Sequence, residues 1–230
     1  GYGRVRGAGG FIKDSIDEKV IKQTVAAPYF FIWGASCLIS AGKLPKALEV
    51  LDQGLHISQT AQSEHMLSQL LQWKAYIHAI QGNHNRAEQE IGESVELRKI
   101  AGGPFYQSFH CILVGAVFAK MGKKRLTKDY FSRALSLAEA IPSPYLKACA
   151  LLHRGLFKLQ SYGEKSALDD LRQGLAAMRE NHYDHFWSWE PASIVNLLAV
   201  AVKSNIERDF ARELAKKRMH IAISDKGECF

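Results

Sequence analysis

Apolar residues recur at helical spacing along most of the chain, in stretches separated by short polar, glycine- or proline-containing breaks. This spacing predicts amphipathic helices, and no stretch alternates as a half-buried strand would. The chain is therefore predicted to be all-α. We predict helices near 28–41, 44–59, 63–81, 84–100, 104–121, 124–140, 144–161, 164–181, 189–203 and 206–219, and a further one near 11–25.

The helical stretches repeat with a period of forty residues. Three sets of small residues recur in four successive copies: one in the first helix, one at the turn (where the last copy is one residue out of register) and one in the second helix. Agreement across four copies indicates a repeat architecture. The three sets are Ala35, Ala75, Gly115 and Gly155; Gly42, Gly82, Gly122 and Gly163; and Gly54, Ser94, Ala134 and Gly174.

The chemistry of these sets predicts how the helices pack. Glycine at a turn can adopt the left-handed conformation that ends a helix. Small residues inside a helix let another helix approach closely, although a mid-helix glycine costs up to ~1 kcal/mol relative to alanine. We therefore expect a right-handed superhelix, or α-solenoid, of antiparallel helix pairs in which each pair buries its apolar sides against its neighbours.

The period also predicts the domain organisation. Residues 28–219 are expected to form one repeat domain, 1–27 a tether that could carry a capping helix, and 220–230 a linker to a following domain. The copies span about 28–61, 62–101, 102–141 and 142–181, with a degenerate copy at 185–219.

The order of residues within a copy resembles the tetratricopeptide repeat, as Ala75, Gly82, Ala87, Ile91 and Ser94 illustrate. The period departs from the thirty-four residues of that family. HEAT-like repeats also have periods near forty but lack this register. Longer tetratricopeptide-like units are similar to the helical-repeat region of MalT-like bacterial transcriptional regulators, and the stretch 208–218 resembles their last repeat before the DNA-binding domain.

The resemblance implies a cytoplasmic, non-catalytic region that binds a small-molecule effector or a protein, with an NTPase module before it and a DNA-binding domain after it. A freestanding tetratricopeptide-like scaffold that binds peptide segments of partner proteins is the alternative. Nonspecific nucleic-acid binding through basic turns is a third hypothesis.

In this family the first helices line the inner surface, so the resemblance also implies a set of recognition residues. Four of them are rings at equivalent positions of successive copies, which we call a column. Such a column suits a small organic molecule or an extended peptide. The same rings could instead fill gaps between helices. The tryptophans of another column, Trp33 and Trp73, are assigned to the core. The predicted recognition residues are Tyr29, His65, Gln69, Gln72, Tyr76, Phe105, Phe109, Tyr145, His185, Trp189 and Asn196, with His65, Phe105, Tyr145 and His185 as the column.

Composition is that of a soluble globular protein, with 47% hydrophobic and 23% charged residues. No apolar run approaches the ~20 residues of a membrane helix, and the N-terminus lacks the apolar stretch of a signal peptide. Cys37, Cys111, Cys149 and Cys229 are scattered without a CxxC pair, which fits a reducing cytoplasm. The first three lie in apolar helical stretches, where a thiol behaves as a small hydrophobe.

Signatures of catalysis are missing from the sequence. It has no GxxxxGK[ST] loop, no GxSxG and no HExxH. His182 and His185 have ligand-like spacing without an accompanying set of cysteines or carboxylates, so we expect neither a metal nor a cofactor. Six carboxylates of the second helices are expected to face solvent: Glu49, Asp52, Glu88, Glu90, Asp169 and Asp170.

The formal net charge of +7 comes partly from two basic clusters. We interpret both as solvated faces, so direct nucleic-acid contact by this region is not expected; the second could approach DNA if a following domain docks there. The first cluster comprises Lys120, Lys123, Lys124, Arg125, Lys128 and Arg133, and the second Lys203, Arg208, Arg212, Lys216, Lys217 and Arg218.

Overall fold

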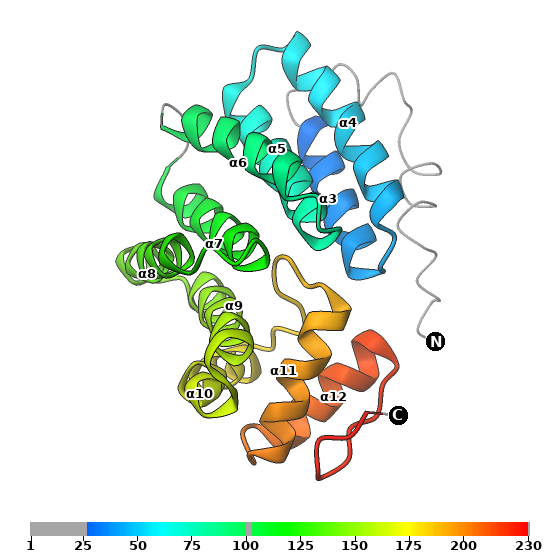
Figure 1. Ribbon diagram of the computed structural model, residues 1–230, viewed down its shortest axis with the longest axis vertical. Helices are drawn as coiled ribbons and strands as arrows, with labels where there is room; N and C mark the ends of the chain where they lie inside the picture. The colour runs from blue at the N-terminus through cyan, green and yellow to red at the C-terminus, as the bar shows by residue number, and fades with distance from the viewer. Residues whose placement is uncertain (1–26, 100–102, 230) are drawn as a thin grey trace. The chain divides into compact units, whose positions relative to one another are not determined.

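The computed structural model describes residues 27–99 and 103–229, and these are predominantly helical (Figure 1). They include no strand, only an isolated bridge between Ile223 and Cys229. The predicted all-α class is confirmed; the predicted helix at 11–25 lies outside the described residues. The helices are α3 (Ala27–Ser40), α4 (Leu44–Thr60), α5 (Glu64–Ile80), α6 (His84–Arg98), α7 (Pro104–Lys120), α8 (Lys124–Ala140), α9 (Pro144–Tyr162), α10 (Glu164–Glu180), α11 (Pro191–Lys203) and α12 (Arg208–Met219).

Local sequence explains where these helices begin and end. Gly42, Gly82 and Gly122 have φ angles of +70°, +76° and +73°, the left-handed conformation that was predicted for the turns. Proline lies in the first turn of α4, α7, α9 and α11, where its missing N–H costs little. The helix bounds therefore follow from residues at the bounds themselves.

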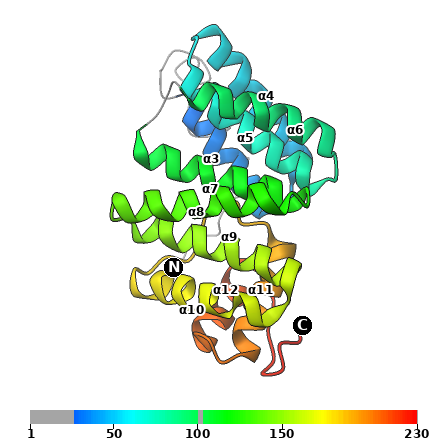
Figure 2. The same cartoon turned by 60° about the vertical axis from the view of Figure 1, so that its left-hand side comes forward.

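Contacts divide the chain into two compact units, residues 1–102 and 103–230, and the division falls at the predicted boundary between the second and third copies. In the first unit, α3 packs against α4, α5 against α6, and both α3 and α4 contact α5. In the second, α7 packs against α8 and α9 against α10, while α11 and α12 form a further pair beside α10 (Figure 2). Consecutive helices thus pack in pairs within each unit.

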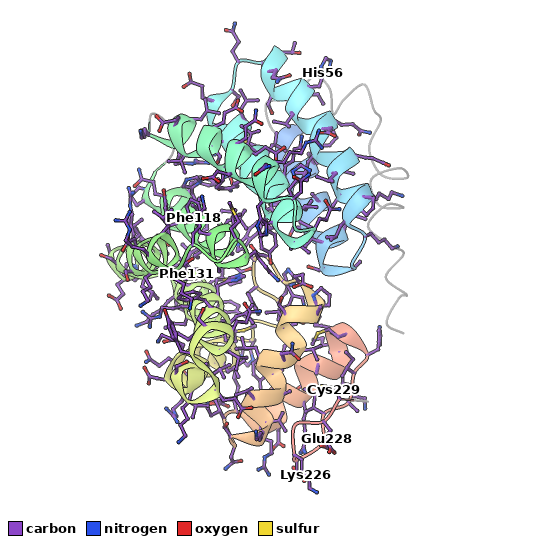
Figure 3. The ribbon with its side chains drawn as sticks, in the orientation of Figure 1. His56, Phe118, Phe131, Lys226, Glu228 and Cys229 are labelled. Atoms are coloured by element: carbon purple, nitrogen blue, oxygen red, sulfur yellow. The ribbon has the colours of Figure 1, made fainter. Side chains whose placement is uncertain are left out.

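Glycines lie where the helices of a pair come closest. A Cβ atom at Gly115 of α7 would lie 2.8 Å from Cε1 of Phe131 in α8, which Figure 3 labels. One at Gly174 of α10 would lie 2.8 Å from Cγ of Leu152 in α9. One at Gly54 of α4 would meet two side chains at 2.9 Å. Real Cβ atoms do not approach so closely, so any larger residue at these positions would force a neighbouring side chain to shift.

A buried ion cluster occupies the seam between α9 and α10. Asp170 is fully buried. Its carboxylate accepts two hydrogen bonds from Arg154, at 2.8 Å from Nε and 2.7 Å from Nη2, and lies 2.9 Å from Nζ of Lys158. The expectation that Asp170 faces solvent is therefore wrong, because two cations of the partner helix draw it into the seam.

The same place in the repeat carries another charged cluster in one pair and an aromatic contact in another. Eighty residues earlier, Glu90 of α6 lies 2.7 Å from Nδ1 of His78 and 3.4 Å from Nζ of Lys74, both in α5. Its side chain is only 14% exposed, so the expectation of a solvated carboxylate is also wrong here. Between these copies, Phe118 of α7 packs on Tyr130 of α8 with ring centroids 5.6 Å apart.

One side of α3 differs from the sequence-based expectation. Trp73 is fully buried as predicted, but Trp33 is 55% exposed and Cys37, one turn further along α3, is exposed. Phe30 lies on the same side and is 39% exposed. The core assignment of Trp33 is wrong, because α4 and α5 pack against the other side of α3 and no described element covers this one.

Residues 220–229, predicted as a linker, lie against the last two helices. Nε of Arg212 donates a hydrogen bond to the carbonyl of Ile223, whose side chain is buried. A Cβ atom at Gly227 would lie 3.0 Å from the carbonyl oxygen of Ala199 in α11. Within the described residues, no helix is long and apolar enough to cross a membrane.

Candidate functional site

In the first unit, predicted recognition residues join a hydrogen-bonded chain with Arg98 of α6. Nη1 of Arg98 lies 2.9 Å from Nδ1 of His65, and Nε2 of His65 lies 3.3 Å from the hydroxyl of Tyr29. Since a guanidinium can only donate, Nδ1 must accept, and Nε2–H then donates to Tyr29. Sequence reasoning placed Tyr29 and His65 together but missed Arg98, which lies on a second helix and is buried.

The charge state of His65 follows from these neighbours. Burial lowers the pKa of His65, and the positive charge of Arg98 lowers it further. The imidazole is therefore neutral at pH 7, with one donor and one acceptor at the half-buried N-terminal end of α5.

The next predicted residues along α5 lie deeper. Gln69 and Gln72 are buried, and Nε2 of Gln72 donates to Oε1 of Gln69 at 2.8 Å. Tyr76 is also buried, edge-on to Trp73 with ring centroids 6.4 Å apart. Among the predicted residues of this unit, only Tyr29 and His65 are part-exposed.

In the second unit, too, some predicted recognition residues are exposed and others are buried. Phe105, at the start of α7, is 45% exposed, whereas Phe109, one turn later, is buried edge-on against Trp187 with ring centroids 4.3 Å apart. Tyr145, at the start of α9, is half-buried and packs edge-on against Tyr183 at 5.2 Å. Two residues outside the predicted set thus cover part of this face.

These covering residues belong to the segment 181–190 between α10 and α11, which we call the aromatic strap. Its Phe186 packs on His153 of α9 and on Trp189, with ring centroids 5.4 and 4.7 Å apart. Predicted residues His185 and Trp189 lie in the strap itself, with ring centroids 5.8 Å apart. Trp189 is buried and His185 half-buried.

Buried hydrogen bonds fix the strap to α9. Nε2 of His153 donates to the carbonyl oxygen of Trp187 at 2.7 Å. Burial lowers the pKa of His153 to about 4, although its bond to Trp187 acts in the opposite direction. Burial also raises the pKa of the Cys149 thiol to about 12, so this thiol stays protonated at neutral pH.

Charged contacts fix the strap at both ends. Near its start, Asp184 lies 2.7 Å from Nζ of Lys217 and also pairs with Arg218. Near its end, Glu190 accepts a hydrogen bond at 3.1 Å from Nζ of Lys120 and another from Ser193. Burial raises the pKa of each carboxyl, but these hydrogen bonds outweigh it and lower both values.

One predicted recognition residue and one histidine with ligand-like spacing stand apart from these clusters. Asn196 is exposed on α11, and its side chain donates to the Ala192 carbonyl of its own helix at 3.4 Å. His182 is exposed. Within the described residues, no group of three or more histidine, cysteine or acidic side chains could hold a metal ion.

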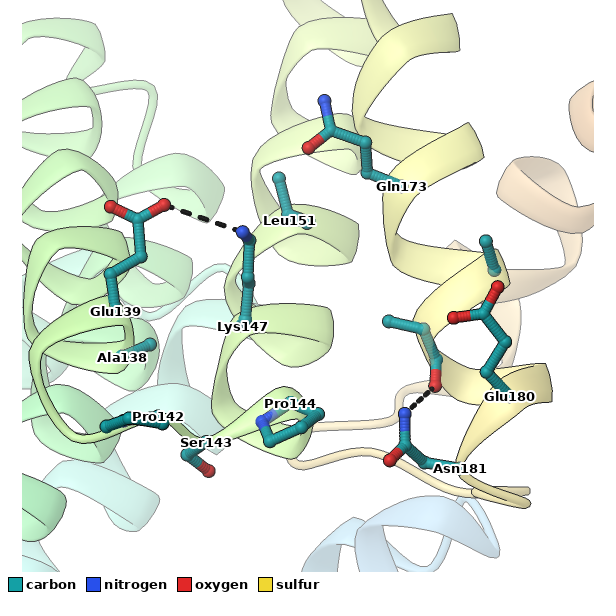
Figure 4. A pocket seen from close by; sticks show the side chains of 12 residues that line it. Ala138, Glu139, Pro142, Ser143, Pro144, Lys147, Leu151, Gln173, Glu180 and Asn181 are labelled. Carbon is teal, nitrogen blue, oxygen red and sulfur yellow. Dashed lines mark hydrogen bonds and ion pairs between the residues drawn. The ribbon is translucent and has the colours of Figure 1, made fainter.

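A groove of about 540 Å³ lies where α8 and α10 end and α9 begins (Figure 4). Pro142, Pro144 and Leu151 are among the apolar residues that line it, and Glu139 lies 3.5 Å from Nζ of Lys147 on one rim. The proline-containing break at 141–144 was visible in the sequence, but the groove also depends on α10, which no local pattern indicates.

These observations define an all-helical protein of consecutive helix pairs. Aromatic and polar side chains lie near the N-terminal end of the first helix of several pairs. No protein-family model matches the chain, and no curated protein matches it.

Proposed function

We propose that the chain is a tetratricopeptide-like repeat region, without catalytic activity, that binds a small-molecule effector or a partner peptide within a bacterial transcriptional regulator. The observation that supports it most is the shared register: in each of the four pairs from α3 to α10, small residues lie at the seam and glycine lies at the turn. In this proposal the pairs are antiparallel and continue one right-handed superhelix.

The binding surfaces in this proposal are the N-terminal ends of the first helices of the pairs, taken within each unit. In the first unit, Tyr29 and His65 offer a hydroxyl and a neutral imidazole, and in the second unit Phe105 offers an exposed ring on a surface of its own. A site with one apolar surface and a few convergent polar groups suits a small organic ligand. Binding would favour one of two states of the full regulator, whose NTPase and DNA-binding domains would flank this region.

The alternative, a freestanding scaffold for peptides, is favoured by the aromatic strap. Its rings lie on Phe109 and Tyr145, both predicted recognition residues, so this face already accommodates an extended aromatic segment of the chain itself. A partner peptide of similar chemistry would use the same kind of contact.

A thermal-shift screen with a metabolite panel tests the proposal. A ligand at 100 times its Kd should stabilise the fold by about 2.7 kcal/mol. The variant His65→Ala should lose this shift, and Phe30→Ala, which removes an exposed ring elsewhere, should keep it. A ligand that shifts all three proteins equally would contradict the proposed surface.

A second experiment separates the two functions. A synthetic peptide of residues 182–190 should bind measurably to a chain with Phe186→Ala/Trp187→Ala if the face accepts peptides. A metabolite shift without peptide binding supports the sensor, and peptide binding without a metabolite shift supports the scaffold. A phosphate-binding loop upstream and a DNA-binding helix-turn-helix downstream in the full-length gene product would support the regulator.

A further inference from the structure

The two basic clusters differ in how far carboxylates neutralise them. In the C-terminal cluster, Lys203 lies 3.0 Å from Glu164, and Lys217 and Arg218 pair with Asp184. Arg208 and Arg212 share Asp225 in the same way. Five of the six cations of this cluster therefore have a carboxylate partner, although three carboxylates serve all five.

In the other cluster, Lys120 pairs with Glu190, but four exposed cations on α8 lack such partners. We call these cations, Lys124, Arg125, Lys128 and Arg133, the α8 basic face. None of the four forms an ion pair with any carboxylate of residues 27–99 or 103–229. The first turn of α8 contains no acidic residue, and Asp129 is the only acidic neighbour within the face.

An aromatic ring positions two of these cations. Nζ of Lys124 and Nζ of Lys128 lie 5.4 and 5.1 Å from the ring centroid of Tyr162, which itself packs edge-on against Phe157. A ring attracts ammonium groups without cancelling their charge. Since like charges four residues apart on a helix repel each other, an anion between them would stabilise the arrangement.

We infer that the α8 basic face binds the phosphate backbone of a nucleic acid without sequence preference. Lys124 and Lys128 are four residues apart, about 6 Å along the helix and nearly in line, with Arg125 beside them, whereas Arg133 lies half a turn around the helix from Lys124. Phosphates of one DNA strand rise by about 3.4 Å each, so Lys124, Arg125 and Lys128 can reach two or more of them. Tyr162 is the one large exposed hydrophobic residue near it, so the face lacks the apolar side chains that insert into a bilayer. This inference does not depend on the proposed function.

Fluorescence anisotropy with a labelled mixed-sequence duplex and a labelled single strand tests the inference on the full chain. Binding at 50 mM salt should weaken with added salt, with a slope of log K against log salt of about −3 to −4 for the duplex. Lys124→Gln/Arg125→Gln/Lys128→Gln should lose at least about tenfold in affinity and reduce that slope by about 3. Tyr162→Leu should weaken binding by about two- to fivefold, because the ammonium groups lose their positioning ring.

The matched control is Lys43→Gln/Lys46→Gln/Arg86→Gln, which removes the same charge from three exposed positions of the first unit. It should bind like the unchanged chain. Three outcomes would overturn the inference: no binding at 50 mM salt, an equal loss in both triple variants, or equal or tighter binding to polyglutamate or to anionic lipid vesicles. Unchanged thermal unfolding of the variants shows that a loss of affinity is not a loss of fold.

Discussion

The pairs α7·α8 and α9·α10 share one register but fill it with different side chains. At the small position of the first helix, Gly115 lies against the ring of Phe131, whereas Gly155, forty residues later, lies against the carboxylate-bearing Asp170. One turn further, α7 contributes Phe118 to an aromatic contact and α9 contributes Lys158 to an ion pair. The comparison teaches that small residues at the seam are shared between the pairs, while the chemistry of the seam is free to vary; the turns differ as well, because α7 ends two residues before Gly122 and α9 runs directly to Gly163.

Asp170→Asn should have the largest effect, because it leaves Arg154 and Lys158 partly buried without their counter-charge. We expect a loss of about 3–5 kcal/mol in the free energy of unfolding, measured by urea denaturation. Asp169→Asn changes an exposed neighbour and should stay within about 0.5 kcal/mol. Equal effects of the two substitutions would contradict the buried ion cluster.

The features that were predicted correctly from the sequence are those set by residues close together along the chain. Helix bounds and the left-handed Gly42, Gly82 and Gly122 were predicted correctly, because proline, glycine and apolar spacing act locally. Solvent exposure of Asp170 and burial of Trp33 were predicted wrongly, because each depends on which distant element covers that side.

The candidate site shows the same limit. Tyr29 and His65 share a surface, in keeping with their place in one predicted recognition set, but Arg98 and the aromatic strap come from other elements. The buried ion clusters did leave a signal in the sequence. Lys74, His78 and Glu90 correspond, eighty residues later, to Arg154, Lys158 and Asp170.

The second prediction concerns how stability depends on pH. His153 of α9 occupies the position that Leu113 occupies in α7. The pKa of His153 is about 4 in the folded chain and 6.5 ordinarily, so between these values the unfolded chain binds a proton that the folded chain excludes. The free energy of unfolding is therefore unaffected by this histidine above about pH 6.5, and it falls by about 3 kcal/mol as the pH drops to 4.

Urea denaturation between pH 4 and 7 measures this slope. His153→Leu, which gives α9 the residue type of α7, should make stability less dependent on pH; His185, whose pKa is also lowered to about 4, keeps part of the dependence. The exposed control His182→Leu should leave the slope unchanged. A His153→Leu chain with the original slope would contradict the buried, neutral imidazole.

The third prediction contrasts the two glycines directly. Gly115→Leu should cost about 1–3 kcal/mol, because its side chain overpacks the buried ring of Phe131. Gly155→Ala should change stability by less than about 1 kcal/mol, because its Cβ would lie 3.3 Å from Cβ of Asp170 and alanine favours the helix. Melting temperatures from circular dichroism rank the two, and a larger loss for Gly155→Ala would contradict the seam geometry.

A double-mutant cycle between Gly115→Ala and Phe131→Leu is the most direct test of the shared register. If the new methyl group meets the Phe131 ring, replacing that ring with the smaller leucine side chain relieves the clash. The double variant should then be more stable than the sum of the single changes by at least about 1 kcal/mol in urea denaturation. Effects that add to within about 0.5 kcal/mol would show that the two positions do not touch and would contradict the packing on which the repeat interpretation rests.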